Sequence, residues 1–318
     1  MQSKLLTAVL LACLAVFGQS KSAWADIMNV NVDGVDPRYR SAFLQAEAFW
    51  ESRVIAYNPI LPASVRAQLT KLQITAVSTA IDGVGGILGS AGPTSVIQFG
   101  STAPGFKQTR GTPIAIARTS QMNFDIADIE DLAANGSLLD VIKHEMAHAM
   151  GFGSLWQQNG LLSTINGQLQ YTGVNALAKY RTESGNRAAR WVPVEQAGGG
   201  GTAGSHWDDD DPFFNRRTRS GSSELMIGSI DPGNETKFTS ETTWAAMADL
   251  WYVVRGINDV GYREPRVSPG GRRKWTGGPP QFLTSTGGGP AGVPEPGSIG
   301  LLLALGACGT LVRSRRKS

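Results

Sequence analysis

The sequence contains very little cysteine. Of its 318 residues only two are cysteines, Cys13 and Cys308, and each lies close to one end. The chain between them can form no disulfide and offers no thiolate to a metal ion. Its stability must come from an apolar core, for which the 41% hydrophobic content is sufficient, with or without help from a bound metal.

The sequence also lacks a strong excess of charge of either sign. The formal net charge is +3, but six of the 29 basic residues belong to the two ends, leaving 23 against 26 acidic residues. The six are Lys4, Lys21, Arg313, Arg315, Arg316 and Lys317. The body is therefore slightly acidic, which excludes a nucleic-acid partner.

The sequence has no apolar run of about 20 residues, the length that spans a membrane comfortably. The first 25 residues are instead typical of an export signal, with Lys4 before a short apolar run over 5–17. The small-x-small sequence Ala23-Trp24-Ala25 then provides a cleavage site before Asp26. We therefore expect the body to begin at Asp26.

The body alternates between helix-like and strand-like patterns, which favours an α+β fold. The predicted elements are a helix over 35–57, strands over 71–81 and 112–119, irregular loops over 83–105, a helix from 138 to Gly151, and a last helix over 243–254. A Gly just after the last helical residue permits a left-handed end to the helix, so Gly151 is the expected stop.

The helix that ends at Gly151 contains His144-Glu145-Met146-Ala147-His148. Positions i and i+4 share one face of a helix, so His144 and His148 suit two ligands of one metal ion. Glu145 lies beside the first of them, where its carboxylate can reach a water on the metal. This pattern is the zincin signature, two histidines on zinc with glutamate as general base.

A catalytic zinc needs a third protein ligand. In thermolysin-like zincins that ligand is a glutamate soon after the motif, but no acidic residue lies between Glu145 and Glu183. In metzincins the motif continues to a third histidine after Gly151, and here Ser154 stands at that place. The remaining histidine of the chain is His206, which we predict to be the third ligand.

The sequence HEMAHAMGFGSLW, followed by His206-Trp207 and then by Ser223-Glu224-Leu225-Met226, resembles the leishmanolysin-type metzincins. In that family an insertion separates the motif glycine from the third histidine, and a Met-turn follows. The resemblance covers residues 31–262 and implies a zinc ion on His144, His148 and His206, with Met226 beneath it as a floor that does not bind the metal. Relatives are typically rich in disulfides, and this chain departs from them there.

The resemblance also implies the architecture. It predicts a zinc metalloprotease domain over 26–262, in which a mixed sheet packs on the active-site helix. The substrate cleft would separate an upper subdomain, about 26–151, from a smaller, loop-rich C-terminal one, about 152–262.

The C-terminal part has a different composition. Residues 263–292 are rich in Gly, Pro and Ser and form a predicted linker. Residues 293–318 resemble the bacterial PEP-CTERM sorting tag, with Pro294-Glu295-Pro296, a short apolar transmembrane segment over 299–312, and a basic cluster. The resemblance implies transient retention in the inner membrane and cleavage by an exosortase-type enzyme; the alternative is a plain C-terminal anchor.

Together these features predict an exported zinc endopeptidase of the bacterial cell envelope or the extracellular space. Glu145 would act as general base on a zinc-activated water, and an extended protein or peptide substrate would pair with the strand over 112–119. Two alternatives remain: a non-catalytic, zinc-stabilised surface or adhesion protein, and a zinc hydrolase acting on a non-peptide amide.

Overall fold

The computed structural model describes residues 26–99, 114–199, 201–216, 222–230, 236–259 and 309–313. The predicted export signal, the linker and most of the predicted sorting tag lie outside these ranges. Among the described residues, no helix is both long and apolar enough to cross a membrane.

The described elements are a mixture of helices and strands, with several strands following one another directly. In chain order they are β1 (Met28–Gly34), α2 (Arg40–Glu51), β2 (Val54–Tyr57), α3 (Ala63–Arg66), β3 (Leu72–Thr79), β4 (Ile87–Phe99), β5 (Ile114–Asp125), α4 (Ile129–Ala134), α5 (Leu138–Met150), β6 (Leu162–Ile165), β7 (Gln168–Tyr171), α6 (Val174–Glu183), β8 (Val192–Pro193), β9 (Ser222–Glu224), β10 (Ser229–Ile230), β11 (Thr236–Phe238), α8 (Glu241–Asp249), β12 (Tyr252–Val254) and β13 (Gly309–Arg313).

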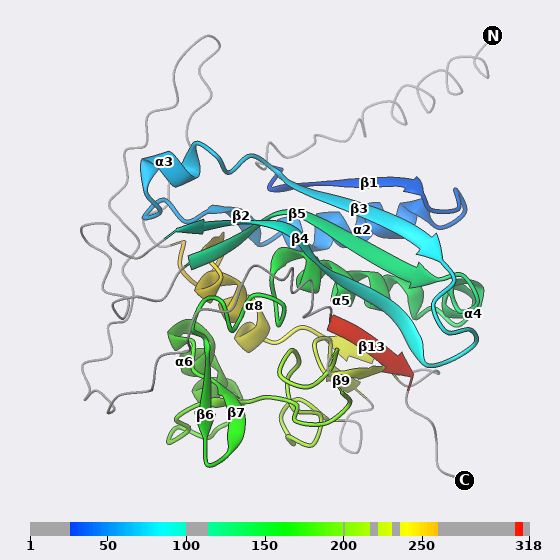
Figure 1. Cartoon of the computed structure of the whole chain (residues 1–318). Coiled ribbons are helices and arrows are strands. Elements are labelled where there is room, and N and C mark those ends of the chain that lie inside the picture. The colour runs from blue at the N-terminus through cyan, green and yellow to red at the C-terminus, as the bar shows by residue number, and fades with distance from the viewer. Residues whose placement is uncertain are drawn as a thin grey trace, which may run out of the picture.

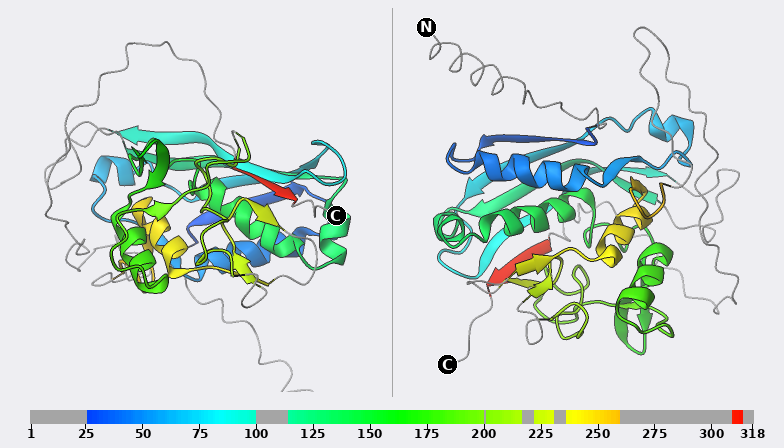
Figure 2. Two further views of the ribbon diagram at one scale, coloured as in Figure 1. Left: turned by 90° about the horizontal axis from the view of Figure 1, so that it is seen from below. Right: turned by 180° about the vertical axis from the view of Figure 1, so that it is seen from behind.

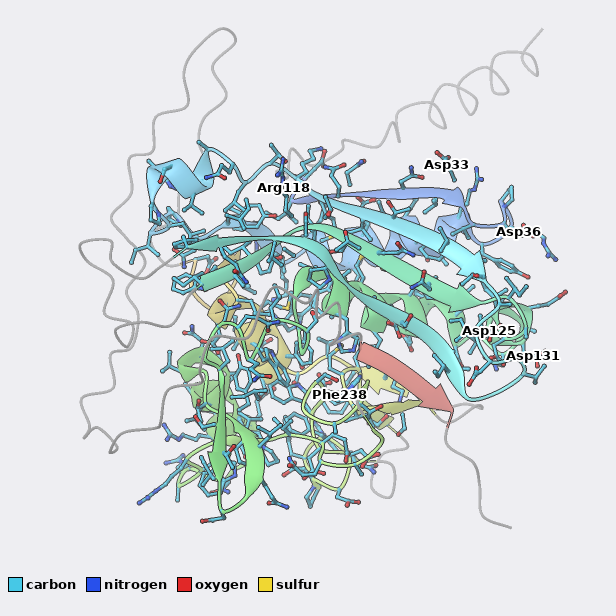
Figure 3. All side chains as sticks on the ribbon, in the orientation of Figure 1. Asp33, Asp36, Arg118, Asp125, Asp131 and Phe238 are labelled. Atoms are coloured by element: carbon cyan, nitrogen blue, oxygen red, sulfur yellow. The ribbon has the colours of Figure 1, made fainter. Side chains whose placement is uncertain are left out.

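The main sheet is mixed, as the sequence predicted, and has the strand order β1-β3-β5-β4-β13-β10. Strands β1, β3 and β5 are parallel, whereas β4 runs antiparallel to β5 and β13 runs antiparallel to β4. Asp125 ends β5 and accepts hydrogen bonds from the N–H groups of Ile81, Asp82 and Gly83, which fixes the loop that leads into β4 (Figure 3).

Helices α2 and α5 run along one face of this sheet (Figure 2). Phe43 of α2 packs edge-on against Phe124 of β5, with 5.0 Å between ring centroids. The indole N–H of Trp50 donates to the carbonyl of Lys143 on α5 at 3.0 Å. The buried face of α2 therefore holds α5 against the sheet, and most elements that follow α5 lie on its far side (Figure 1).

Several predicted boundaries are wrong. The helix predicted over 35–57 is α2 followed by β2, and the helix over 243–254 is α8 followed by β12. The loops predicted over 83–105 contain β4. Residues 309–312, expected to close a transmembrane segment, lie in β13, because a short apolar run with β-branched residues suits a strand equally well.

Candidate metal centre

Helix α5 positions His144 and His148. It continues without interruption to Met150 and ends in Gly151, whose φ of 113° is left-handed, as predicted. The Gly151 N–H donates to His148 O, and the Phe152 N–H donates to Ala147 O, both at 3.0 Å, which is the pattern of a Schellman turn. The turn also aims the carbonyl of Phe152 at the ring of His148.

His206 comes from a segment far along the chain, at the end of a run of turns over 201–205. Its carbonyl accepts from Glu195 N–H at 3.0 Å, and the next residue, Trp207, donates its backbone N–H to Met226 O at 3.0 Å. His206 and Met226 are therefore held in neighbouring backbone segments, and both are completely buried. Ser154, which occupies the usual place of a third histidine, instead donates its hydroxyl to His148 O at 2.7 Å.

The three histidines meet through their Nε2 atoms. The Nε2 atoms of His144 and His148 are 2.9 Å apart, and each lies 3.0 Å from Nε2 of His206. Every Nδ1 atom faces a carbonyl oxygen: that of Leu225 at 2.7 Å, of Phe152 at 2.9 Å and of Thr202 at 3.0 Å. A carbonyl can only accept, so each Nδ1 carries the proton and each Nε2 presents a lone pair to the other two.

The charge state of the three rings agrees with this arrangement. Burial lowers the pKa of His206 to about 4. Burial also lowers the pKa values of His144 and His148 well below that of an ordinary histidine, and the neighbouring imidazoles lower them further. All three rings are therefore neutral at physiological pH, the state in which histidine binds a metal.

These residues fit a zinc ion. Zinc–nitrogen bonds of about 2.0–2.1 Å in tetrahedral geometry place the ligand nitrogens about 3.3 Å apart, close to the observed separations. Three lone pairs aimed at one another repel unless a cation lies between them. The predicted residues His144, His148 and His206 are thus brought together as a group that can hold zinc.

Glu145, the predicted general base, directly follows His144 on α5. Its side chain is completely buried, and neither carboxylate oxygen has a hydrogen-bond partner among the described residues. Burial raises the pKa of its carboxyl well above the ordinary value. Burying a carboxyl group without partners is costly, and no hydrogen bond among the described residues offsets that cost for Glu145.

Glu224 supports the backbone segment that carries Met226, a role that the sequence pattern did not predict. Its buried carboxylate accepts from the Met226 N–H, from Ser240 N–H at 3.0 Å and from the Thr243 hydroxyl at 2.6 Å. The intervening Leu225 presents the carbonyl that receives the His144 ring N–H. Glu224 therefore fixes the backbone that orients His144, and its place two residues before Met226 was the available signal.

Gly153 lets the α5 turn approach the segment of His206. Its φ is 66°, and a Cβ built there would lie 2.2 Å from the carbonyl oxygen of Ser205. No side chain fits without moving one of the two segments. Gly153 thus allows the turn after α5, the helix that carries His144 and His148, to lie close to the segment that carries His206.

We expect Gly153→Ala to destabilise the protein by about 2–4 kcal/mol, because left-handed strain adds to a backbone overlap. It should also weaken zinc binding, since the overlap moves Ser205 and hence His206. Gly167→Ala is the matched control: its φ is 80°, with nothing within 4 Å of the added Cβ. Urea unfolding and zinc titration should show strain of about 1 kcal/mol and unchanged zinc affinity for the control. Equal zinc affinities of the two variants would contradict this role for Gly153.

The strand predicted over 112–119 is found within β5, and its pairing with a substrate stays a prediction. Residues 114–117 pair with β4 alone, and from residue 119 onward β5 also pairs with β3. The strand next to the histidines is β4, where a Cβ on Gly89 would lie 3.1 Å from Cγ of Glu145. Strand β4 was assigned to loops because of its Gly, Ser and Pro content.

A helix-borne His-Glu-x-x-His pair joined by a distant third histidine defines a zincin-type metallopeptidase site. The family model for leishmanolysin, peptidase family M8, matches residues 95–255, half of the chain. The chain therefore belongs to the leishmanolysin family of zinc metallopeptidases. No curated protein matches the sequence.

Proposed function

We propose that this chain is an exported zinc endopeptidase in which His144, His148 and His206 hold the metal and Glu145 is the general base. Support for the metal comes from the three converging neutral imidazoles. Support for catalysis comes from the single observation that Glu145, the residue after His144 on α5, is buried with both oxygens unpartnered among the described residues. A purely structural zinc site has no use for such a group.

When bound, zinc supplies a Lewis acid that lowers the pKa of water and polarises a carbonyl. The carboxylate of Glu145 accepts a proton from the attacking water and passes it to the leaving amine. Burial raises the pKa of the Glu145 carboxyl, and a bound cation nearby would lower it toward the range in which the carboxylate can accept a proton. The carbonyls of Leu225, Phe152 and Thr202 hold the histidine rings in the required tautomer.

The edge of β4 is the proposed binding surface for an extended peptide. Gly89 brings this edge against Glu145, so a peptide added there as a strand would lie beside the general base. Met226 is proposed to form the floor of the metal site without binding the metal. The substrate cleft is proposed to lie between the two subdomains, which meet near Gly151. Export through residues 1–25 and sorting through residues 293–318 complete the proposal.

The test is the zinc content and casein hydrolysis of residues 26–290. We expect about one zinc ion per chain, loss of hydrolysis after removal of the metal with a chelator, and recovery on addition of zinc. Zinc binding without hydrolysis of casein or of any peptide would instead support the adhesion protein. Cleavage confined to small non-peptide amides would support the other alternative, a zinc hydrolase that acts on a non-peptide amide.

A further inference from the structure

Strand β13 (Gly309–Arg313) lies in the main sheet between β4 and β10, near the segment that carries Met226 (Figure 1). On one side it pairs antiparallel with residues 87–91 of β4. On the other it pairs parallel with β10 (Ser229–Ile230), which begins three residues after Met226. One short strand from the far C-terminal end thus bridges the two walls of the proposed cleft.

The same strand lies next to the general base. Leu311 is paired with Gly89, the residue whose added Cβ would lie 3.1 Å from Cγ of Glu145. Strand β13 also approaches α5, the helix that carries Glu145 and two of the histidines. Its backbone therefore follows the path that an extended peptide on β4 would take.

A strand edge offers one row of N–H and C=O groups, which can pair with one partner at a time. While β13 is paired with residues 87–91, a peptide cannot add to them. In this arrangement His144, Glu145, His148 and His206 are each 0% exposed, although a protease site must admit its substrate. The C-terminal strand and a substrate are thus mutually exclusive occupants of the edge.

We propose that Gly309–Arg313 is an intramolecular occupant of the substrate-binding edge and inhibits the peptidase while the C-terminal segment is attached. This rests on the proposed function. Thr310 and Val312 are β-branched and favour the extended conformation that pairing requires. A tethered segment has an effective concentration in roughly the millimolar range, so even weak pairing in cis competes with a free substrate.

The position of the strand gives the inhibition a natural release. Cleavage near residues 293–298, where the sorting tag is predicted to be processed, separates Gly309–Arg313 from the catalytic body. The strand then loses its tether and its high effective concentration. The peptidase would accordingly remain inhibited until its C-terminal segment is removed.

Occupancy is tested without reference to activity by a cross-strand disulfide in residues 26–318 carrying Cys308→Ser. Ser90 and Thr310 lie directly opposite each other, at a spacing that a disulfide can bridge. We expect Ser90→Cys with Thr310→Cys to cross-link on mild oxidation. The matched control joins Thr310→Cys to Ser95→Cys, further along β4, and should not cross-link. Failure of the first pair to exceed the control overturns the proposal.

Inhibition is tested in the same chain with Thr310→Pro and Leu311→Pro together, since proline cannot donate to a strand ladder. Peptide hydrolysis should rise about tenfold or more, toward the rate of residues 26–290. The matched control replaces another Leu-Thr pair, Leu283→Pro with Thr284→Pro, and should leave the rate unchanged. Equal rates for the unsubstituted chain and the Thr310/Leu311 variant overturn the proposal.

The two proposals fail in different ways. If residues 26–290 bind zinc but hydrolyse nothing, the proposed function fails, and the disulfide comparison alone decides whether β13 occupies the edge. If residues 26–290 and the unsubstituted 26–318 chain hydrolyse peptide equally well, the proposed function stands and the inhibitory strand does not.

Discussion

Glu145→Gln in residues 26–290 is expected to retain about one zinc ion per chain and to lose casein hydrolysis by about 10²–10⁴-fold, the contribution of a positioned general base. Glutamine keeps the size of the side chain but cannot accept the proton of an attacking water. Zinc is retained because Glu145 has no place among the three Nε2 atoms. Metal analysis and initial rates measure the two effects separately.

The same substitution should stabilise the metal-free protein. Burial strongly raises the Glu145 pKa, so the carboxylate destabilises the folded chain, whereas a neutral amide is less costly to bury. Thermal unfolding in the presence of a chelator measures the gain. A variant that hydrolyses casein at nearly the original rate would contradict the general-base role and leave the zinc site without a catalytic residue.

Glu47→Gln is the matched control for Glu145. Burial and the neighbouring Glu51 raise the pKa of Glu47 to about 7, so it is another carboxyl with a raised pKa, but it is only half-buried on α2. Its substitution should change neither zinc content nor hydrolysis. If both variants lost activity equally, the effect would reflect the fold rather than the chemistry of Glu145.

The metal helix could be predicted from sequence because its chemistry is local. His144 and His148 are one turn apart, and Gly151 ends the helix in a left-handed conformation, so all three follow from residue spacing and backbone sterics. The third histidine required elimination and a family resemblance. Its position depends on backbone hydrogen bonds of Glu195 and Met226 with the segment of His206, and no spacing in the sequence encodes them.

The sheet next to the site was harder to predict. Strand β4 contains Gly, Ser and Pro and was assigned to loops, yet it pairs along most of β5. Its small residues allow a close approach to α5, because a Cβ at Gly89 would lie only 3.1 Å from Cγ of Glu145. Tertiary packing therefore outweighs local strand propensity at this edge.

Glu224 shows a second limit of prediction from the sequence. A glutamate shortly before a methionine is common in a sequence, and its structural role is seen only from the hydrogen bonds that Ser240 and Thr243 donate to it. The structure thereby links the start of α8 to the Met226 segment and, through Leu225, to His144. Such support is read from hydrogen bonds between distant segments and not from a motif.

His206→Ala in residues 26–290 is expected to abolish hydrolysis and to weaken zinc binding by more than the 10–100-fold typical of changes outside the ligand set. The two remaining histidines leave zinc with an incomplete set of protein ligands. Zinc titration by calorimetry and initial rates with casein measure both losses.

Thermal unfolding separates loss of metal from loss of fold. Bound zinc stabilises the native state by about 4 kcal/mol when its concentration is a thousand times its dissociation constant. The parent chain should therefore gain stability on addition of zinc, whereas His206→Ala should not, and the two should be closer in stability when both are metal-free. Ser205→Ala is the control: the Ser205 hydroxyl lies 3.0 Å from His206 Nδ1, but Thr202 O still accepts from that ring nitrogen. A zinc-dependent gain in His206→Ala equal to that of Ser205→Ala would remove His206 from the metal site and, with it, the convergence on which the proposed chemistry depends.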